Sequence, residues 1–159
     1  MANTVNAIPE GFQGATPYLC ARGAAAAIEF YKKAFGAIEI MRMEAPDGRL
    51  GHAEIQIGTA KLMLADEYPE MGFRSPQTLG GSPVTIHIYV EDVDALAAQA
   101  ESAGAKVLRP VADQFYGDRS CQLADPFGHV WSFATHKEDI SPEEMKRRAA
   151  AFAARKANS

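Results

Sequence analysis

The chain has 159 residues, a hydrophobic content of 47% and a net charge of −4, a size that fits one domain or two small halves sharing a core. The acidic balance, with a pI of about 5.6, argues against a general nucleic-acid surface, and no apolar run approaches the ~20 residues of a membrane helix. The first residues have neither the basic start nor the apolar core of a secretion signal. The two cysteines lie far apart and form no CxxC motif, so we expect a reduced, cytoplasmic setting.

The first half of the chain alternates strand-like and helix-like patterns. Residues 24–35 carry an apolar stripe of helical period, which Gly36 ends. Runs of strand-forming residues between turn signals predict strands at 15–21, 37–43, 51–58 and 60–66. Residues 67–83 show no periodicity and are rich in Pro, Gly and Ser, which predicts a linker or a mobile loop.

The same order of elements recurs in the second half. Strands are predicted at 84–90, 106–112, 118–124 and 129–135, with a helix over 93–102 that ends at Gly104. The helix-ending glycines Gly36 and Gly104 lie 68 positions apart, and aligning the strand that begins at Gly51 on Ser120 gives an offset of 69. An almost constant offset over a whole βαβββ unit indicates a duplication. The alternative is that two similar units fall at similar spacing by chance.

The two ends of the chain stand apart from the repeat. Ser141 and Glu144 form a capping box with Pro142 at the first helical position, which predicts a C-terminal helix rich in alanine. The predicted organisation is an N-terminal arm (1–13), a first module (14–66), a linker or loop (67–83), a second module (84–139) and the C-terminal helix (140–159).

Several short sequence segments, which occur in order and at the offset of the repeat, resemble a known family. The helix-stop Gly-Ala, DVDALAAQAESAGA, DPFGH and YGDRSCQLADPFGHVWSFATHKED resemble the vicinal oxygen chelate superfamily, which holds glyoxalase I, bleomycin-resistance proteins and extradiol dioxygenases. The last phrase is most similar to its PhnB-like, glyoxalase-related subgroup, and the resemblance covers about residues 14–139. It implies an α+β fold in which two tandem βαβββ modules form a curved mixed sheet around an inter-module cleft.

The resemblance also implies where a metal would be held. In metal-using members four ligands come from the first and last strands of the two modules, and those positions here are Thr16, Met63, Thr85 and Ser132. A thioether and neutral hydroxyls bind divalent ions poorly compared with imidazole and carboxylate groups. We therefore predict no cofactor and do not expect glyoxalase I activity.

Strand alternation assigns the predicted faces independently of the family. The apolar residues of each strand mark a core face, and the remaining residues mark an open face suited to lining a cleft. The open faces assigned in this way carry His52, Glu54 and Gln56; Lys61, Met63 and Ala65; Thr85, His87 and Tyr89; Val130, Ser132 and Ala134; and, by the same parity, Arg119, Cys121 and Leu123.

The ionisable residues of these open faces are the candidate catalytic groups. His52 and Glu54 project from the same side of one strand and can act with His87 and Arg119 as an acid–base set. A divalent metal held by His52, Glu54 and His87 is the alternative, and a polar cluster without a ligand is the plainest reading. The predicted ligand-binding residues are Thr16, Tyr18, Gln56, Met63, Thr85, Tyr89, Tyr116, Cys121 and Ser132.

Two functional hypotheses follow from these residues. The first is a small enzyme or enzyme-like protein of the superfamily that binds and transforms a small polar or aromatic metabolite. The second is a non-catalytic protein of the bleomycin-resistance type, which sequesters a flat organic compound among Tyr18, Met63, Tyr89 and Tyr116. Both require a small-molecule ligand, with neither nucleic acid nor membrane as a partner. Because the duplicated modules offer a symmetric surface, we also expect a homodimer.

Overall fold

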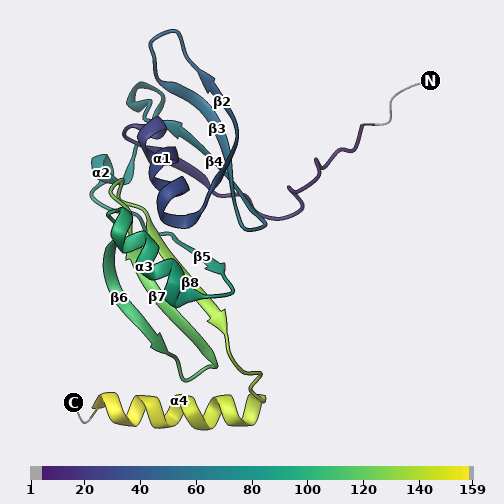
Figure 1. Ribbon diagram of the computed structural model, residues 1–159, viewed down its shortest axis with the longest axis vertical. Helices are drawn as coiled ribbons and strands as arrows, with labels where there is room; N and C mark the ends of the chain where they lie inside the picture. The colour runs from purple at the N-terminus through teal and green to yellow at the C-terminus, as the bar shows by residue number, and fades with distance from the viewer. Residues whose placement is uncertain (1–4, 158–159) are drawn as a thin grey trace. The chain divides into compact units, whose positions relative to one another are not determined.

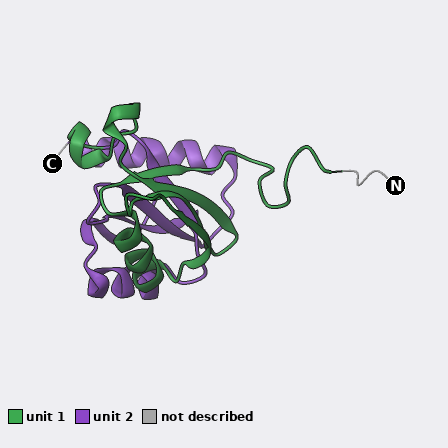
Figure 2. Ribbon diagram, turned by 90° about the horizontal axis from the view of Figure 1, so that it is seen from above, with its two compact units in different colours: residues 1–81 green, residues 82–159 purple. Residues whose placement is uncertain are grey.

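The computed structural model describes residues 5–157 (Figure 1). The chain forms two compact units, Met1–Gly81 and Ser82–Ser159 (Figure 2). Each unit contains one four-stranded mixed sheet with a helix packed on one face. The predicted α+β class and the pair of βαβββ modules with a C-terminal helix are confirmed. None of the helices within residues 5–157 is long and apolar enough to cross a membrane.

The first unit has its sheet in the order β1-β4-β3-β2, with β1 parallel to β4 and the other pairs antiparallel. Its elements are β1 (Tyr18–Ala21), α1 (Ala24–Phe35), β2 (Ile38–Glu44), β3 (Leu50–Ile57), β4 (Ala60–Asp66), a short 3-10 helix η1 (Pro69–Met71) and α2 (Pro76–Leu79). The core lies between α1 and the sheet, where Ile28 and Tyr31 of the helix are fully buried with Ile55 and Leu64 of the strands.

The second unit repeats this topology, with the order β5-β8-β7-β6. Its elements are β5 (Thr85–Tyr89), α3 (Val93–Ala103), β6 (Lys106–Asp113), β7 (Asp118–Ala124), β8 (Val130–His136) and α4 (Pro142–Ala157). Trp131 and Phe133 are fully buried and stack in parallel, 6.1 Å between ring centroids. Together with Leu123 they form the core that α3 covers.

The start of the module helix is held by the last residues of the module's last strand in both units. In the first unit, Asp66 at the end of β4 accepts hydrogen bonds from the amides of Gly23 and Ala24. In the second, Thr135 near the end of β8 accepts from the amide of Val93. Asp66 and Thr135 are 69 residues apart, so the two modules use the same position of the fold to fix the helix start.

The hairpin between the last two strands differs by one register position between the units. Glu54 lies opposite Met63 in the first sheet, whereas Gln122 lies opposite Ser132 in the second. The offset between the modules is therefore 69 on the last strand but 68 on the strand before it. The additional residue lies in the connection of the second unit: Asp125 pairs with His129 across residues 126–128, whereas Ile57 pairs with Ala60 across residues 58–59.

This register corrects one sequence-based face assignment. Cys121 lies opposite Phe133 and Leu123 lies opposite Trp131, and residues directly opposite in a sheet point to the same face. Arg119, Cys121 and Leu123 therefore lie on the helix-covered face of the second sheet, not on its open face. Because side chains alternate with a period of two, the offset of 69 taken from the sequence placed this strand on the wrong side.

Two further expectations differ from the structure in detail. The segment predicted as a linker or mobile loop contains η1 and α2, and Ser75 within it is fully buried. Its sequence lacks periodicity because both helices are a single turn long, so no amphipathic stripe develops. Ala65 and Ala134, assigned to open faces, lie on those faces by register but are buried.

Candidate functional site

The open face of the first sheet carries a hydrogen-bonded chain of three polar side chains. The hydroxyl oxygen of Tyr18 lies 2.7 Å from Nδ1 of His52, and Nε2 of His52 lies 3.3 Å from a carboxylate oxygen of Glu54. Tyr18 comes from β1, whereas His52 and Glu54 project from the same side of β3. The predicted pairing of His52 with Glu54 is present, and Tyr18 joins it because β1 and β3 both flank β4.

The chemistry of the three groups determines which group donates and which accepts in each of these hydrogen bonds. An ionised carboxylate only accepts hydrogen bonds, so we assign the His52 Nε2 proton as the donor to Glu54. Nδ1 of His52 then accepts, and the Tyr18 hydroxyl donates to it. Burial, with a further contribution from the charge of Glu54, raises the pKa of Tyr18. Tyr18 is therefore a neutral phenol whose oxygen keeps lone pairs for another donor.

A pocket lies directly against the hydrogen-bonded side chains of Tyr18, His52 and Glu54. It has a volume of about 390 Å³ and is lined by Tyr18, Gly51, Ala65, Tyr68, Met71 and Phe73, all from the first unit. The rings of Tyr18 and Phe73 meet edge to face, with centroids 5.8 Å apart. We call this cavity the strap pocket, because residues 67–75 (the strap) provide three of its walls.

Ionic contacts hold the strap in place. The Arg49 guanidinium stacks 3.8 Å over the Tyr68 ring, pairs with Glu70 at 2.9 Å and donates to the carbonyl of Glu67. The Glu67 carboxylate pairs with Arg22 and accepts from the Ser75 amide at 2.8 Å. Tyr68 and Phe73 also exchange backbone hydrogen bonds, which turns both rings toward one pocket.

The open face of the second sheet carries a separate polar network. The predicted residue His87 bonds to Ser132 through Nδ1 at 2.9 Å, and its ring meets the Tyr89 ring edge to face. The Tyr89 hydroxyl donates to Asp118 at 2.7 Å. His136 completes the network because its Nδ1 lies 2.8 Å from the other oxygen of Asp118.

His136 and Asp118 perturb each other. Hydrogen bonds to Asp118 and to Asp139 raise the pKa of His136. Burial of Asp118 disfavours its charged form, but the hydrogen bonds from His136 and Tyr89 outweigh this and lower its pKa. The pair ties the start of β7 to the end of β8, and the contact of His136 with Asp139 adds the segment that leads into α4.

This pair predicts a defined pH window for the stability of the second unit. A lowered Asp118 pKa contributes stability above its unfolded value of 3.8, and a raised His136 pKa contributes stability below its unfolded value of 6.5. The pair therefore stabilises most between these values, and its contribution falls as pH rises through the folded His136 pKa. We expect His136→Gln to lower Tm at about pH 5.5 and to differ little from wild type at about pH 9. An equal Tm difference at both pH values in circular dichroism melts would contradict this.

Three other predicted residues lie away from these networks. Arg119 makes a bidentate pair with Asp94 of α3 and also contacts Asp113, and these hydrogen bonds raise its pKa. Cys121 is buried, which raises the pKa of its thiol. Tyr116 lies between β6 and β7 with its ring against Phe115. The first two therefore serve the helix-covered side of the sheet.

The four positions that correspond to metal ligands do not fit a metal ion. Met63 lies opposite Tyr18 and Glu54, and Ser132 lies opposite His87. Together with Thr16 and Thr85 these positions offer one thioether and three hydroxyls, which are weak donors for divalent ions. Across residues 5–157, no group of three or more His, Cys, Asp or Glu side chains is arranged to hold a metal.

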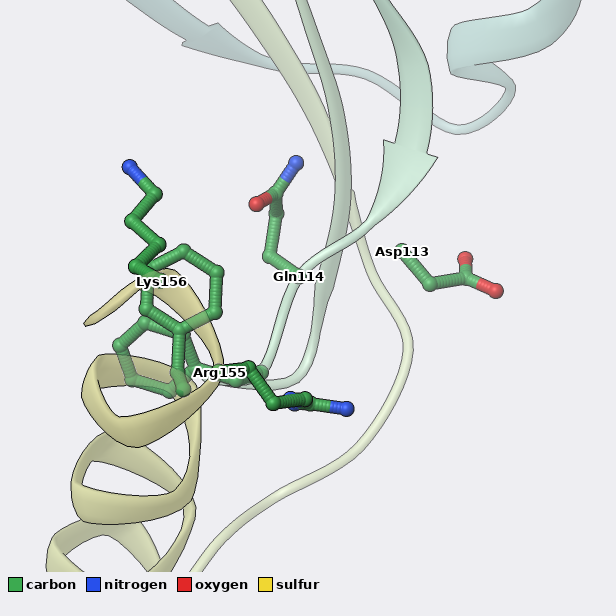
Figure 3. Close-up of a pocket in the computed structure, with 6 residues that line it drawn as sticks. Asp113, Gln114, Arg155 and Lys156 are labelled. Carbon is green, nitrogen blue, oxygen red and sulfur yellow. The ribbon is translucent and has the colours of Figure 1, made fainter. Parts of the chain in front are cut away.

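A second hollow lies where α4 meets the segment between β6 and β7 (Figure 3). Its volume is about 370 Å³, and it is lined by Asp113, Gln114, Phe115, Phe152, Arg155 and Lys156. The Phe115 and Phe152 ring centroids are 5.0 Å apart, and Lys156 lies over the Phe152 ring. Cations in the last turn of a helix complement its dipole. We interpret the hollow as part of the contact by which α4 packs against the segment between β6 and β7.

Sequence reasoning missed the strap residues and the Asp118–His136 pair. Tyr68, Met71 and Phe73 lie in a segment without periodicity, where only the cluster of large apolar residues in EYPEMGF gives a signal. The pairing of Asp118 with His136 depends on the register between β7 and β8, which the sequence patterns do not give.

Comparison with known proteins shows the family. Residues 15–133 match the Glyoxalase/Bleomycin resistance protein/Dioxygenase superfamily. Over 134 residues the chain is 46% identical to the Mycobacterium tuberculosis protein described as "Uncharacterized protein Rv0887c", covering 82% of this chain and 79% of that protein. The crystal structure of the Arabidopsis thaliana At5g48480 product is 28% identical, with a TM-score of 0.64 over 77% of this chain and 98% of that one. TioX from Micromonospora sp. ML1 shares the fold at 22% identity, with a TM-score of 0.62 over 80% and 99% of the two chains. The chain belongs to the glyoxalase/bleomycin resistance protein/dioxygenase superfamily.

Proposed function

We propose that this protein binds a small polar or aromatic metabolite in the strap pocket and uses the Tyr18–His52–Glu54 chain as a proton acceptor. The observation that carries the proposal is that this hydrogen-bonded chain ends on the wall of an aromatic pocket. Apolar pockets with a few convergent polar groups are the usual form of small-molecule sites. The family supports a small-molecule ligand in general terms.

The proton would move along existing hydrogen bonds. An O–H or acidic C–H of the ligand would lose its proton to the Tyr18 oxygen as the Tyr18 proton passes to Nδ1 of His52, and the electron pair would stay on the ligand. Glu54 would stabilise the imidazolium that forms, the role of the orienting carboxylate in acid–base dyads. His87 and Tyr89 belong to the separate network of the second unit, and neither they nor the ion-paired Arg119 receive a role in this proposal.

A non-catalytic role is the second candidate, and a specific observation favours it. The four family ligand positions hold only weak metal donors, and the strap pocket is mainly apolar. Such a pocket suffices to sequester a flat organic compound without transforming it. The two candidates differ in whether a bound ligand loses a proton.

One experiment with the uncharged ring ketone 2-tetralone separates these cases. Calorimetry measures its binding, and NMR in D2O measures exchange of its acidic C–H protons. We expect Phe73→Ala to weaken binding about tenfold by removing a pocket wall, and His52→Gln to retain binding but slow exchange about 100-fold. Tyr89→Phe is the control, because it removes a tyrosine hydroxyl that donates to Asp118 in the other unit and does not line this pocket.

Each outcome decides between the candidates. Binding without exchange in the wild type would favour sequestration. Absence of binding, or binding that Phe73→Ala leaves unchanged, would contradict a ligand in this pocket.

We also propose that the chain forms a homodimer. The edge strand β2 exposes Ile38, Ile40 and Met43, an apolar edge that monomeric proteins usually protect. Light scattering should then give about twice the 17.1 kDa mass of one chain.

A further inference from the structure

The lining of the strap pocket carries no charge. Of its six described lining residues, Tyr18, Tyr68 and Phe73 are aromatic, and the others are Gly51, Ala65 and Met71. An ionised ligand would lose part of its hydration on entering and find no lining residue of opposite charge. Burying an unpaired charge costs far more than burying an apolar ring of the same size. The lining therefore favours an uncharged, flat ligand.

The guanidinium that stacks on the Tyr68 wall is already paired. Arg49 stacks on Tyr68, but it contacts Asp47 at 2.7 Å and Glu70 at 2.9 Å and also donates to the carbonyl of Glu67. An anionic ligand would have to displace these partners in order to use Arg49. Arg49 therefore positions the Tyr68 wall and is held by its own partners.

The surrounding carboxylates make the pocket unfavourable for negative charge. Cys20 lies opposite the pocket residue Ala65, and its pKa is raised to about 11 by burial and by the charges of Glu67 and Asp66. The pKa of Tyr18 is raised by burial and by Glu54. Both raised pKa values mean that negative charge is disfavoured beside the pocket, and the pairing of Arg49 with carboxylates has the same effect.

One polar atom of the lining is suited to a ligand donor. The Tyr18 hydroxyl donates its proton to His52, so its oxygen can only accept from a ligand. A hydroxyl or N–H at the edge of a ring would satisfy this oxygen, whereas an ether or a bare hydrocarbon would leave it unsatisfied.

We infer that the strap pocket selects an uncharged aromatic ring that carries one hydrogen-bond donor, and that it rejects the carboxylate of the same ring. This inference rests on the proposed function and adds the chemical class of the ligand. The rejection of the carboxylate comes from the pairing of Arg49 with Asp47 and Glu70 and from the charge of Glu54. The preference for a hydrogen-bond donor comes from the hydroxyl oxygen of Tyr18.

Three probes of one ring size test this selectivity by calorimetry: 2-naphthol, 2-methylnaphthalene and 2-naphthoate. We expect 2-methylnaphthalene to bind about tenfold more weakly than 2-naphthol, the loss of one hydrogen bond, and 2-naphthoate at least 30-fold more weakly. Tyr18→Phe should abolish the difference between the two neutral probes. The double variant Asp47→Asn, Glu70→Gln should release Arg49 and recover at least fivefold in naphthoate affinity.

The results distinguish a failure of the proposed function from a failure of the inferred ligand class. If the wild type binds none of the probes, or if Phe73→Ala leaves their binding unchanged, the proposed function fails. If 2-naphthoate binds as tightly as 2-naphthol in a site that Phe73→Ala disrupts, the pocket stands and the ligand class is wrong. Circular dichroism melts of each variant show that a lost affinity does not come from unfolding.

Discussion

Replacing Trp131 with alanine should lower the free energy of unfolding of the second unit by about 4 kcal/mol. Trp131 is the largest fully buried side chain of the protein's described part, and its ring stacks on Phe133. Its indole N–H donates to the buried Asp125 at 2.9 Å. The alanine variant would leave a cavity between sheet and α3 and remove one partner of a buried carboxylate.

Trp131→Phe separates the two causes of this loss. It keeps most of the buried ring but removes the hydrogen bond to Asp125, so we expect about 2 kcal/mol. Because Trp131 is the chain's only tryptophan, urea unfolding should be followed by circular dichroism and not by fluorescence. Equal losses in the two variants would show that the cavity contributes little.

Replacing Asp66 with alanine should destabilise the first unit by about 3 kcal/mol. One oxygen of this carboxylate accepts from the amides of Gly23 and Ala24, and the other accepts from the amide of Leu50 at 2.7 Å. Ala24 and Leu50 are buried, so water cannot readily replace the lost acceptor. One side chain thus connects the start of α1 to the start of β3.

The second unit provides the matched control for Asp66. Thr135 occupies the corresponding position and accepts one hydrogen bond, from the amide of Val93. Because its hydroxyl is neutral and makes two hydrogen bonds, the second being one that it donates to the Val90 carbonyl at 2.9 Å, Thr135→Ala should cost only about 2 kcal/mol. Hydrogen exchange of the amides of Ala24 and Val93 would report each loss locally. A larger effect at Thr135 than at Asp66 would contradict this account.

The strands and helices were predictable because their patterns are local. The apolar stripe of residues 24–35 and the glycine after it predicted α1, and the bounds of β4 and β7 agree with the predicted ranges. The capping box at Ser141 predicted α4, and the Ser141 hydroxyl does accept from the Glu144 amide. The repeating order of the elements, together with segments such as DVDALAAQAESAGA and DPFGH at the repeating offset, then sufficed for the family and the fold.

The candidate site was less predictable because it depends on register and on loops. The sequence placed His52 beside Glu54, since the two are separated by one residue on a strand. It could not place Arg119 against Asp94, because that pair depends on which face of β7 meets α3. Nor could it bring Tyr68 and Phe73 to one pocket, since a non-periodic segment does not show where its side chains point.

The longer connection between β7 and β8 has a practical consequence for engineering this protein. Counting by register, the position of His52 in the first sheet is held by Ser120 in the second, and that of Glu54 by Gln122. A numerical shift of 69 would instead graft the histidine at Cys121, into the buried core. Transplanting the dyad therefore requires Ser120→His and Gln122→Glu, with the neighbouring core positions left untouched.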